Sequence, residues 1–149
     1  MKKEYFKIIP ASYLLLLKDN NILMIRRYNT GYRDGDYSLP AGHVEDGESA
    51  IEALIREIKE EINIDIEKTN IKFVHTVYRQ KEDSNIDSTR IDFYFEVKEW
   101  GGDIKNNEPD KCDDILWFNI DDLPKNIVPV VKQAIENYKK EQYYSEALF

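Results

Sequence analysis

The sequence predicts an α/β fold, a single domain over residues 1–149 in which helices pack on a mixed β-sheet. Three observations support this fold class. The chain has 149 residues, which is the size of one domain. Several short apolar runs, partly alternating with polar residues, are separated by turn-forming residues, as β-strands are. Two longer stretches, one early and one late, repeat apolar residues at the spacing of an α-helix.

Five segments have the composition of β-strands. Two of them lie on either side of the polar stretch Lys18–Asn21 and are expected to form a hairpin. Two more flank the polar loop Gln80–Thr89 and are expected to pair antiparallel. A turn-rich loop, Tyr28–Tyr37, leads into a short extended piece, Ser38–Pro40. The five strands are Ser12–Leu17, Ile22–Arg27, Lys72–Arg79, Arg90–Trp100 and Ile115–Ile120.

Two segments are predicted to be amphipathic helices, Glu48–Ile62 and Val128–Tyr144. Asn63 directly follows the first helix and suits a left-handed C-terminal cap. Whether the tail Tyr143–Phe149 packs on a partner or frays is left open. The first helix has the clearer pattern, with a stripe formed by Ile51, Leu54, Ile55, Ile58 and Ile62.

The formal net charge of −8 argues against DNA or RNA as a partner, because binding to a nucleic acid backbone relies on clustered lysine and arginine. An anionic small molecule would need a bound divalent cation to reverse the local charge. Cys112 is the single cysteine and excludes an internal disulfide, and we assign it no role. With only two histidines, a structural zinc site is not expected.

These features fit a reducing cytoplasm, which is the expected location. No run of the sequence reaches the roughly 18 apolar residues of a membrane span, so no membrane association is expected.

Three glutamates share one face of the first predicted helix. Glu57, Glu60 and Glu61 project together, roughly opposite the apolar stripe, and like charges at this spacing repel each other. A cation among them would relieve the repulsion, and an all-oxygen ligand set favours Mg²⁺ or Mn²⁺. The alternative is that these acids are solvated surface residues. Ala50 and Ala53 are expected to leave open space beside the carboxylates.

A spaced motif contains these glutamates. The sequence has Gly42, five residues, Glu48, seven residues, then Arg56-Glu57-Ile58-Lys59-Glu60-Glu61-Ile62-Asn63-Ile64. This arrangement resembles the Nudix box, which asks for glycine where the chain has Asn63. Asparagine is the next best residue for a left-handed cap, so the departure leaves the motif intact.

The resemblance continues beyond the box, from about Ser12 to about Tyr138, and is closest to MutT-like members. It implies an α/β/α sandwich around a mixed β-sheet and a Mg²⁺- or Mn²⁺-dependent hydrolase.

The resemblance also implies roles for residues of the box. Glu57, Glu60 and Glu61, with the main-chain carbonyl of Gly42, would be the metal ligands. Glu48 and Arg56 match positions that pair with other box residues and fix the geometry of loop and helix.

Residues outside the box are candidates for catalysis and substrate binding. A general base must accept a proton from water, and it is either a box glutamate or a loop acid, for which Glu108 is the candidate; the alternative for Glu108 is a solvated loop acid. Arg26 and Arg27 are positioned to meet substrate phosphates, or else serve solubility. Asn126 is placed to read a purine base, or else caps the last helix.

The expected substrate is a small nucleoside diphosphate derivative. A MutT-like nucleoside triphosphate pyrophosphohydrolase, acting for instance on oxidised purine nucleotides such as 8-oxo-dGTP and giving the monophosphate and pyrophosphate, is the leading hypothesis. The box itself recognises only diphosphate and metal, so an ADP-sugar, NADH or a dinucleoside polyphosphate are alternatives, as is a non-catalytic nucleotide-binding module. A homodimer is one of the oligomeric states left open.

Overall fold

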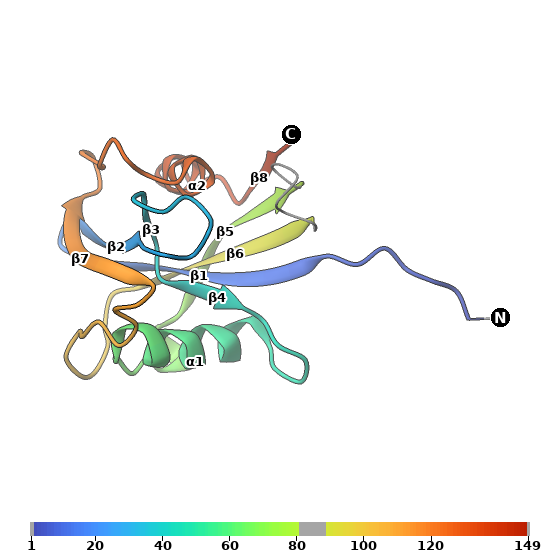
Figure 1. The fold of residues 1–149 in the computed structure, drawn as a ribbon, viewed down its shortest axis with the longest axis horizontal. Helices are drawn as coiled ribbons and strands as arrows, with labels where there is room; N and C mark the ends of the chain where they lie inside the picture. The colour runs from blue at the N-terminus through green and yellow to red at the C-terminus, as the bar shows by residue number, and fades with distance from the viewer. Residues whose placement is uncertain (1, 81–88, 149) are drawn as a thin grey trace.

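A computed structural model describes residues 2–80 and 89–148 of the chain (Figure 1). The loop expected at Gln80–Thr89 therefore lies almost entirely outside the described residues. The strands are β1 (Ile9–Lys18), β2 (Asn21–Arg27), β3 (Tyr37–Ser38), β4 (Ala41–His43), β5 (Lys72–Arg79), β6 (Arg90–Val97), β7 (Cys112–Asn119) and β8 (Tyr144–Ala147), and the helices are α1 (Ala50–Ile62), the short 3-10 helix η1 (Lys68–Asn70) and α2 (Pro129–Lys139).

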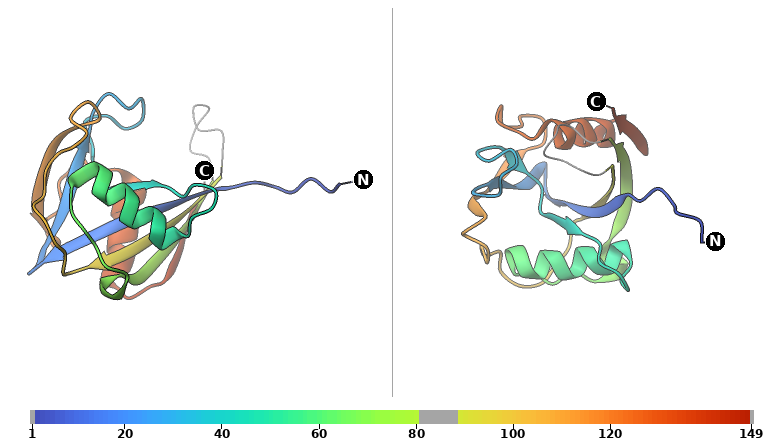
Figure 2. Two further views of the ribbon diagram at one scale, coloured as in Figure 1. Left: turned by 90° about the horizontal axis from the view of Figure 1, so that it is seen from below. Right: turned by 45° about the vertical axis from the view of Figure 1, so that its right-hand side comes forward.

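The molecule has three layers, with α1 on one side of the strands and α2 on the other (Figure 1). Seen from below, α1 lies across the strands (Figure 2). The main strand order is β3-β2-β1-β6-β5-β8, while β4 pairs with β1 and β7 pairs with β2. The β1/β6 and β5/β8 pairs are parallel and the others are antiparallel, so the sheet is mixed. The predicted α/β/α sandwich is confirmed.

Strand β1 is the centre of the fold because it is buried on both faces. Leu14 and Leu16 belong to the apolar cluster beneath α1, whereas Leu15 and Leu17 belong to the cluster beneath α2. Successive side chains of a strand point to opposite faces, so the same run of leucines contributes side chains to both apolar clusters. Burying each leucine contributes about 1.5–3 kcal/mol.

Helix α1 begins and ends at residues with clear capping roles. Ser49 accepts a hydrogen bond from the Glu52 N–H, and the Glu52 carboxylate accepts one from the Ser49 N–H, which together form a capping box. The helix therefore begins at Ala50 and not at Glu48. Asn63 has the predicted left-handed conformation, with φ 69°. The expectation that Ala53 leaves open space is wrong, because Ala53 is fully buried.

The C-terminal segment differs from the prediction. Helix α2 ends at Lys139, five residues before the expected end at Tyr144, and Glu141 adopts a left-handed φ of 57°. The chain then forms β8, which pairs parallel with β5 and supplies backbone partners to this edge. His75 fixes the segment, because its Nδ1 donates to the Gln142 carbonyl at 2.7 Å and its Nε2 accepts from the Ser145 hydroxyl at 2.8 Å.

Other boundaries shift by a few residues. The β1/β2 hairpin exists, but its antiparallel pairing covers only the two residue pairs next to the turn, where Asp19 is left-handed. β2 also pairs with β7 along its whole length, from Asn21 to Arg27, and this pairing extends β7 back to Cys112. Strand β6 ends at Val97, before the predicted Trp100. In the described part of the chain no helix is long and apolar enough to cross a membrane.

We expect His75→Phe to destabilise the protein by about 1–3 kcal/mol, since it removes the two hydrogen bonds that the buried imidazole makes with the Gln142 carbonyl and the Ser145 hydroxyl. Urea unfolding at pH 7 measures this loss, with Lys72→Gln on the exposed start of β5 as the control. A His75→Phe variant as stable as the wild type would contradict the anchoring role.

The same histidine predicts a pH dependence. Burial lowers the pKa of His75 below its ordinary value of about 6.5, because the interior disfavours imidazolium. The unfolded chain therefore binds this proton more tightly than the folded chain, so the folded state loses stability as the pH falls below about 6.5. His75→Phe should lose less stability than the wild type between pH 7 and pH 5.5 in the same urea series.

Candidate active site

A cleft of about 460 Å³ lies beside α1 and brings together five of the residues singled out in the sequence. They come from four different segments of the chain: the end of β2, strand β4, helix α1 and the segment before β7. These residues are Arg27, Gly42, Glu57, Glu61 and Glu108, and the remaining lining is Ile25, Asn29, Thr30, Ala41, His43, Ile62, Lys111 and Cys112.

The carboxylates of Glu57 and Glu61 enter the cleft because they lie one turn apart on α1, facing β4. The Glu61 Oε2 accepts a hydrogen bond from the Ala41 N–H at 3.0 Å. The backbone at Gly42 lies directly against the Glu57 carboxyl group, and a Cβ atom at position 42 would overlap that group. Glycine is therefore required at position 42 for the main chain to approach the glutamate so closely.

Glu108 reaches the cleft because the segment before β7 is hydrogen-bonded to the end of α1. The N–H groups of Lys105 and Asn107 donate to the carbonyls of Ile62 and Glu61 at 2.9 and 3.0 Å. This places Glu108 next to the glutamates of the helix, with Lys111 at 3.7 Å as its exposed ion-pair partner.

The electrostatics of the cleft favour a cation. Burial raises the pKa of Glu57, and the charges of Glu60 and Glu108 raise it further against the opposing effect of Arg56. Burial also raises the pKa of Glu61 well above its usual value, and Glu108 and Glu57 add to the effect. The carboxyl groups are thus held together with too little positive charge to favour their ionised forms, and a divalent ion would supply the missing charge.

Arg56 fixes the loop between β4 and α1. Its Nη2 and Nε donate to the two oxygens of Glu48 at 2.7 and 3.0 Å, and Nη2 also donates to the His43 carbonyl at 3.2 Å. This contact lowers the pKa of Glu48 to about 2. Arg56 also donates to Glu57 at 2.8 Å, so it links the loop to the cleft carboxylates.

Other candidate residues are not brought into the cleft. The Glu60 side chain is 56% exposed and its Oε2 lies 3.4 Å from Arg56 Nη1. Over residues 2–80 and 89–148, no three His, Cys, Asp or Glu side chains are close enough to hold one metal ion.

Arg26 and Asn126 also lie elsewhere. Arg26 points to the opposite face of β2 from Arg27, as strand alternation requires, and pairs with Asp113 at 2.7 Å. The Asn126 amide donates to the Gly35 carbonyl at 2.9 Å. Asn126 does not cap α2, because the N-cap residue is Val128 and no side chain caps the helix.

Two lining residues had no assigned role from the sequence. Cys112 is buried beside the cleft, and burial raises the pKa of its thiol, so it contributes a neutral wall. His43 faces the cleft from β4, and burial lowers its pKa, with the positive charges of Arg90 and Arg79 adding to this effect. The positions of Cys112 and His43 in the cleft depend on which strands pair with one another, and this pairing cannot be read from a single sequence.

A comparison with protein families identifies the family to which the chain belongs. The NUDIX domain family matches residues 8–138 of the chain. This chain belongs to the Nudix hydrolase family. The resemblance inferred from the box is thereby confirmed.

Curated Nudix relatives cover most of the chain. It is 35% identical over 124 residues to the NAD-capped RNA hydrolase NudC of Pseudomonas putida (strain W619), a match that spans 82% of the chain and 40% of that relative. It is 32% identical over 148 residues to NudC of Pseudomonas fluorescens (strain Pf0-1), spanning 98% of the chain and 48% of that relative. The chain thus spans less than half the length of these relatives.

Solved Nudix structures share the fold. The MutT Nudix hydrolase of Burkholderia pseudomallei superposes with a TM-score of 0.79 at 25% identity, covering 87% of this chain and 97% of that one. The MutT protein of Methanosarcina mazei Go1 superposes with a TM-score of 0.77 at 20% identity, covering 93% and 98%, and shows the likeness in fold alone.

We expect Glu48→Gln to loosen the loop between β4 and α1, because it removes the negative charge of the carboxylate to which Arg56 donates two hydrogen bonds. The midpoint of urea unfolding should fall, and the Glu45 N–H, which donates to Glu48 at 2.8 Å, should exchange faster with solvent. Glu45→Gln is the matched control, since the Glu45 carboxylate is 69% exposed and lies 3.9 Å from Arg56. Equal behaviour of the two variants would exclude a positioning role for Glu48.

Proposed function

We propose that this chain is a divalent-metal-dependent hydrolase that cleaves a phosphoanhydride bond in a nucleoside diphosphate derivative. The observation that carries the proposal is the grouping of Glu57, Glu61 and Glu108 around the Gly42 backbone in one cleft of a Nudix fold. Membership of the Nudix family and the hydrolase names of the relatives support it.

Glu57, Glu60, Glu61 and the Gly42 carbonyl are the groups that would hold Mg²⁺ or Mn²⁺. Glu57 and Glu61 face the cleft, while Glu60 lies outside its lining and beside Arg56. A bound cation of this kind would neutralise phosphate charge and lower the pKa of a water molecule. Arg56 acts as a positioning residue, because it donates hydrogen bonds to Glu57 and to the His43 carbonyl, which follows Gly42 in β4.

Two other side chains of the cleft are candidates for accepting a proton and for binding the substrate phosphate. Glu108 faces the helix glutamates and is the candidate base that accepts the proton of the attacking water. Among the described residues, the Arg27 guanidinium donates hydrogen bonds to the Tyr32 carbonyl and the Thr30 hydroxyl. Phosphate oxygens could replace these two neutral acceptors.

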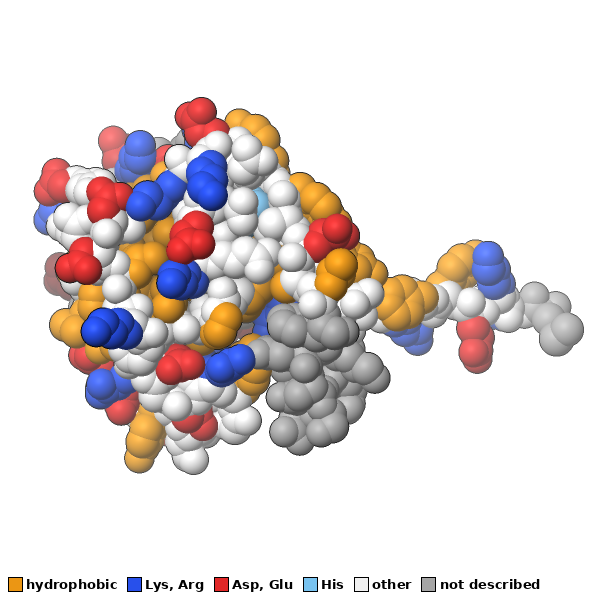
Figure 3. Space-filling model, turned by 90° about the horizontal axis from the view of Figure 1, so that it is seen from above, with side chains coloured by type: hydrophobic (Ala, Val, Ile, Leu, Met, Phe, Trp, Pro, Cys, Tyr) orange, Lys and Arg blue, Asp and Glu red, His pale blue; other side chains and the backbone are white. Residues whose placement is uncertain are grey.

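Two substrate classes follow from the comparisons. The likeness to a MutT hydrolase that is matched over 97% of its length supports a nucleoside triphosphate, including oxidised purine nucleotides such as 8-oxo-dGTP. The NudC relatives, named as NAD-capped RNA hydrolases, support NADH as the second candidate. We favour a small nucleotide over an RNA chain. The net charge is −8, and acidic and basic side chains are interspersed on the face that carries α2 (Figure 3).

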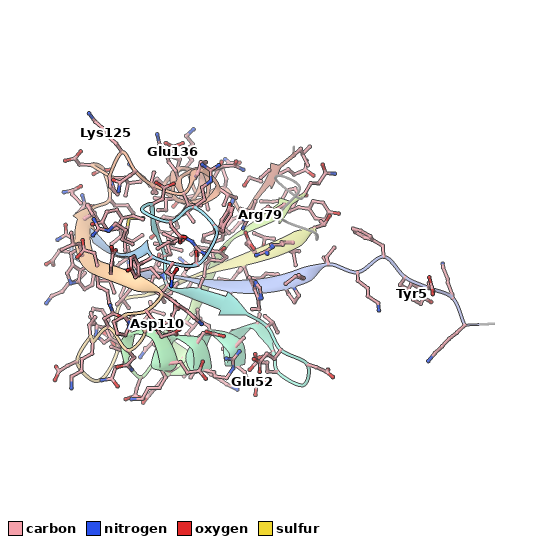
Figure 4. All side chains as sticks on the ribbon, in the orientation of Figure 1. Tyr5, Glu52, Arg79, Asp110, Lys125 and Glu136 are labelled. Carbon is pink, nitrogen blue, oxygen red and sulfur yellow. The ribbon has the colours of Figure 1, made fainter. Side chains whose placement is uncertain are left out.

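We expect Glu57→Gln to lower kcat at least about 100-fold, since even groups that only support a metal ligand contribute 10–100-fold. The nucleotide products formed from dGTP, 8-oxo-dGTP, ADP-ribose, NADH and a dinucleoside tetraphosphate should be separated by chromatography and quantified at matched Mg²⁺. Glu136→Gln, on the exposed face of α2 (Figure 4), is the control, and circular dichroism checks the fold.

Two results would contradict the proposal. Turnover by Glu57→Gln at the wild-type rate would remove the metal assignment, and binding of nucleotides without any turnover would indicate a non-catalytic module. Activity on ADP-ribose or NADH alone would agree with the proposed reaction but remove the nucleoside triphosphate as substrate.

A further inference from the structure

A second cavity of about 370 Å³ opens beside the active-site cleft. The two cavities share Arg27, Thr30, Ala41, Gly42 and His43, so they lie side by side. The second cavity lies at one end of the sheet face that packs toward α2. We call it the cationic lobe, and its side chains come from Tyr13, Arg27, Tyr32, Arg79 and Arg90.

Positive charge is concentrated in the cationic lobe although the whole chain is acidic. Arg79 and Arg90 stand directly opposite each other in the β5/β6 ladder, a position in which like charges destabilise a sheet. Arg79 is only 3% exposed and lies within the body of the molecule (Figure 4). Two arginines thus face one cavity from neighbouring strands.

These arginines have few negative partners. Arg79 pairs with the buried Asp92 at 3.2 Å. Arg90 Nη1 lies 3.3 Å from the neutral His43 Nε2, and Arg27 donates to the Tyr32 carbonyl and the Thr30 hydroxyl. Among the described residues, three guanidinium groups therefore have one carboxylate within ion-pair distance. An anion with up to two charges would balance them.

Unsatisfied polar atoms gather at the same place. Within the described ranges, the buried side-chain atoms without a hydrogen-bond partner are Arg90 Nε, Asp92 Oδ1 and the Tyr94 hydroxyl. All three residues lie on β6 at alternate positions and share one face of the strand, but only Arg90 lines the cationic lobe. Its Nε is a buried donor without a partner, which an acceptor in the lobe would satisfy, whereas Asp92 Oδ1 is itself an acceptor and gains nothing from an anion.

We propose that the cationic lobe binds the third phosphate of a nucleoside triphosphate, which a nucleoside diphosphate lacks. The inference rests on the proposed function and narrows its substrate class to nucleoside triphosphates. A phosphate accepts hydrogen bonds from Arg27, Arg79 and Arg90, and matches their charge. A nicotinamide or a purine would leave the guanidinium charges unbalanced in a confined cavity.

Direct binding tests the cationic lobe without turnover. Inorganic phosphate is titrated into the full chain in the presence of EDTA, and amide chemical shifts report binding. Arg90→Gln should bind phosphate about tenfold more weakly, the loss of one charge-assisted hydrogen bond. Arg90→Lys, which keeps the charge, should retain more affinity. Lys132→Gln, an equal change of charge on the exposed face of α2, should bind as the wild type does.

Kinetics then tests the substrate class with dGTP and dGDP, which differ only in the terminal phosphate. Arg90→Gln should lower kcat/KM about tenfold for dGTP and much less for dGDP or NADH. Arg27→Gln provides a second variant at the rim of the lobe. Equal losses on all three substrates, or unchanged phosphate affinity in Arg90→Gln, would overturn the inference.

The two proposals fail in different ways. If no nucleotide is hydrolysed by the wild type while Arg90→Gln still loses phosphate affinity, the proposed function is wrong and the cationic lobe stands. If dGTP is hydrolysed and Arg90→Gln is indistinguishable from the wild type, the cationic lobe is wrong and the proposed function stands.

Discussion

The burial of carboxyl groups against a glycine backbone is the constraint on which this structure depends. Glu57 and Glu61 project from α1 into a confined cleft, where burial raises their pKa values and the charge of Glu108 adds to the effect. Such an arrangement costs folding free energy unless a cation offsets it. Gly42 makes the arrangement possible, because any larger residue would overlap Glu57.

The rest of the fold holds these groups in place. The capping box at Ser49 and the left-handed Asn63 fix the ends of α1, and the apolar cluster around β1 fixes the face that it buries. Arg56 ties the β4–α1 loop to the helix, and the segment before β7 brings Glu108 to the same cleft. Beyond the cleft, the cationic lobe extends the site along the sheet.

The sequence predicts what local spacing controls. The helix that carries Glu57, its cap at Asn63 and the box from Gly42 are visible in the order of residues, because helical periodicity and the motif are local. The β8 strand was not predicted, since its main partners, the β5 backbone and the His75 side chain, lie far away in the sequence. The sequence also did not predict that Arg79 and Arg90 stand opposite each other, because this depends on the register between β5 and β6.

A calorimetric titration with Mg²⁺, performed on the full chain in the presence of a slowly hydrolysed nucleotide, tests the central claim most directly. The account predicts saturable binding by the wild type and affinity reduced at least about tenfold in Glu61→Gln, because that variant keeps the shape of the side chain but removes its charge. Magnesium affinity that is the same in Glu61→Gln and in the wild type, or no binding by either, would contradict it.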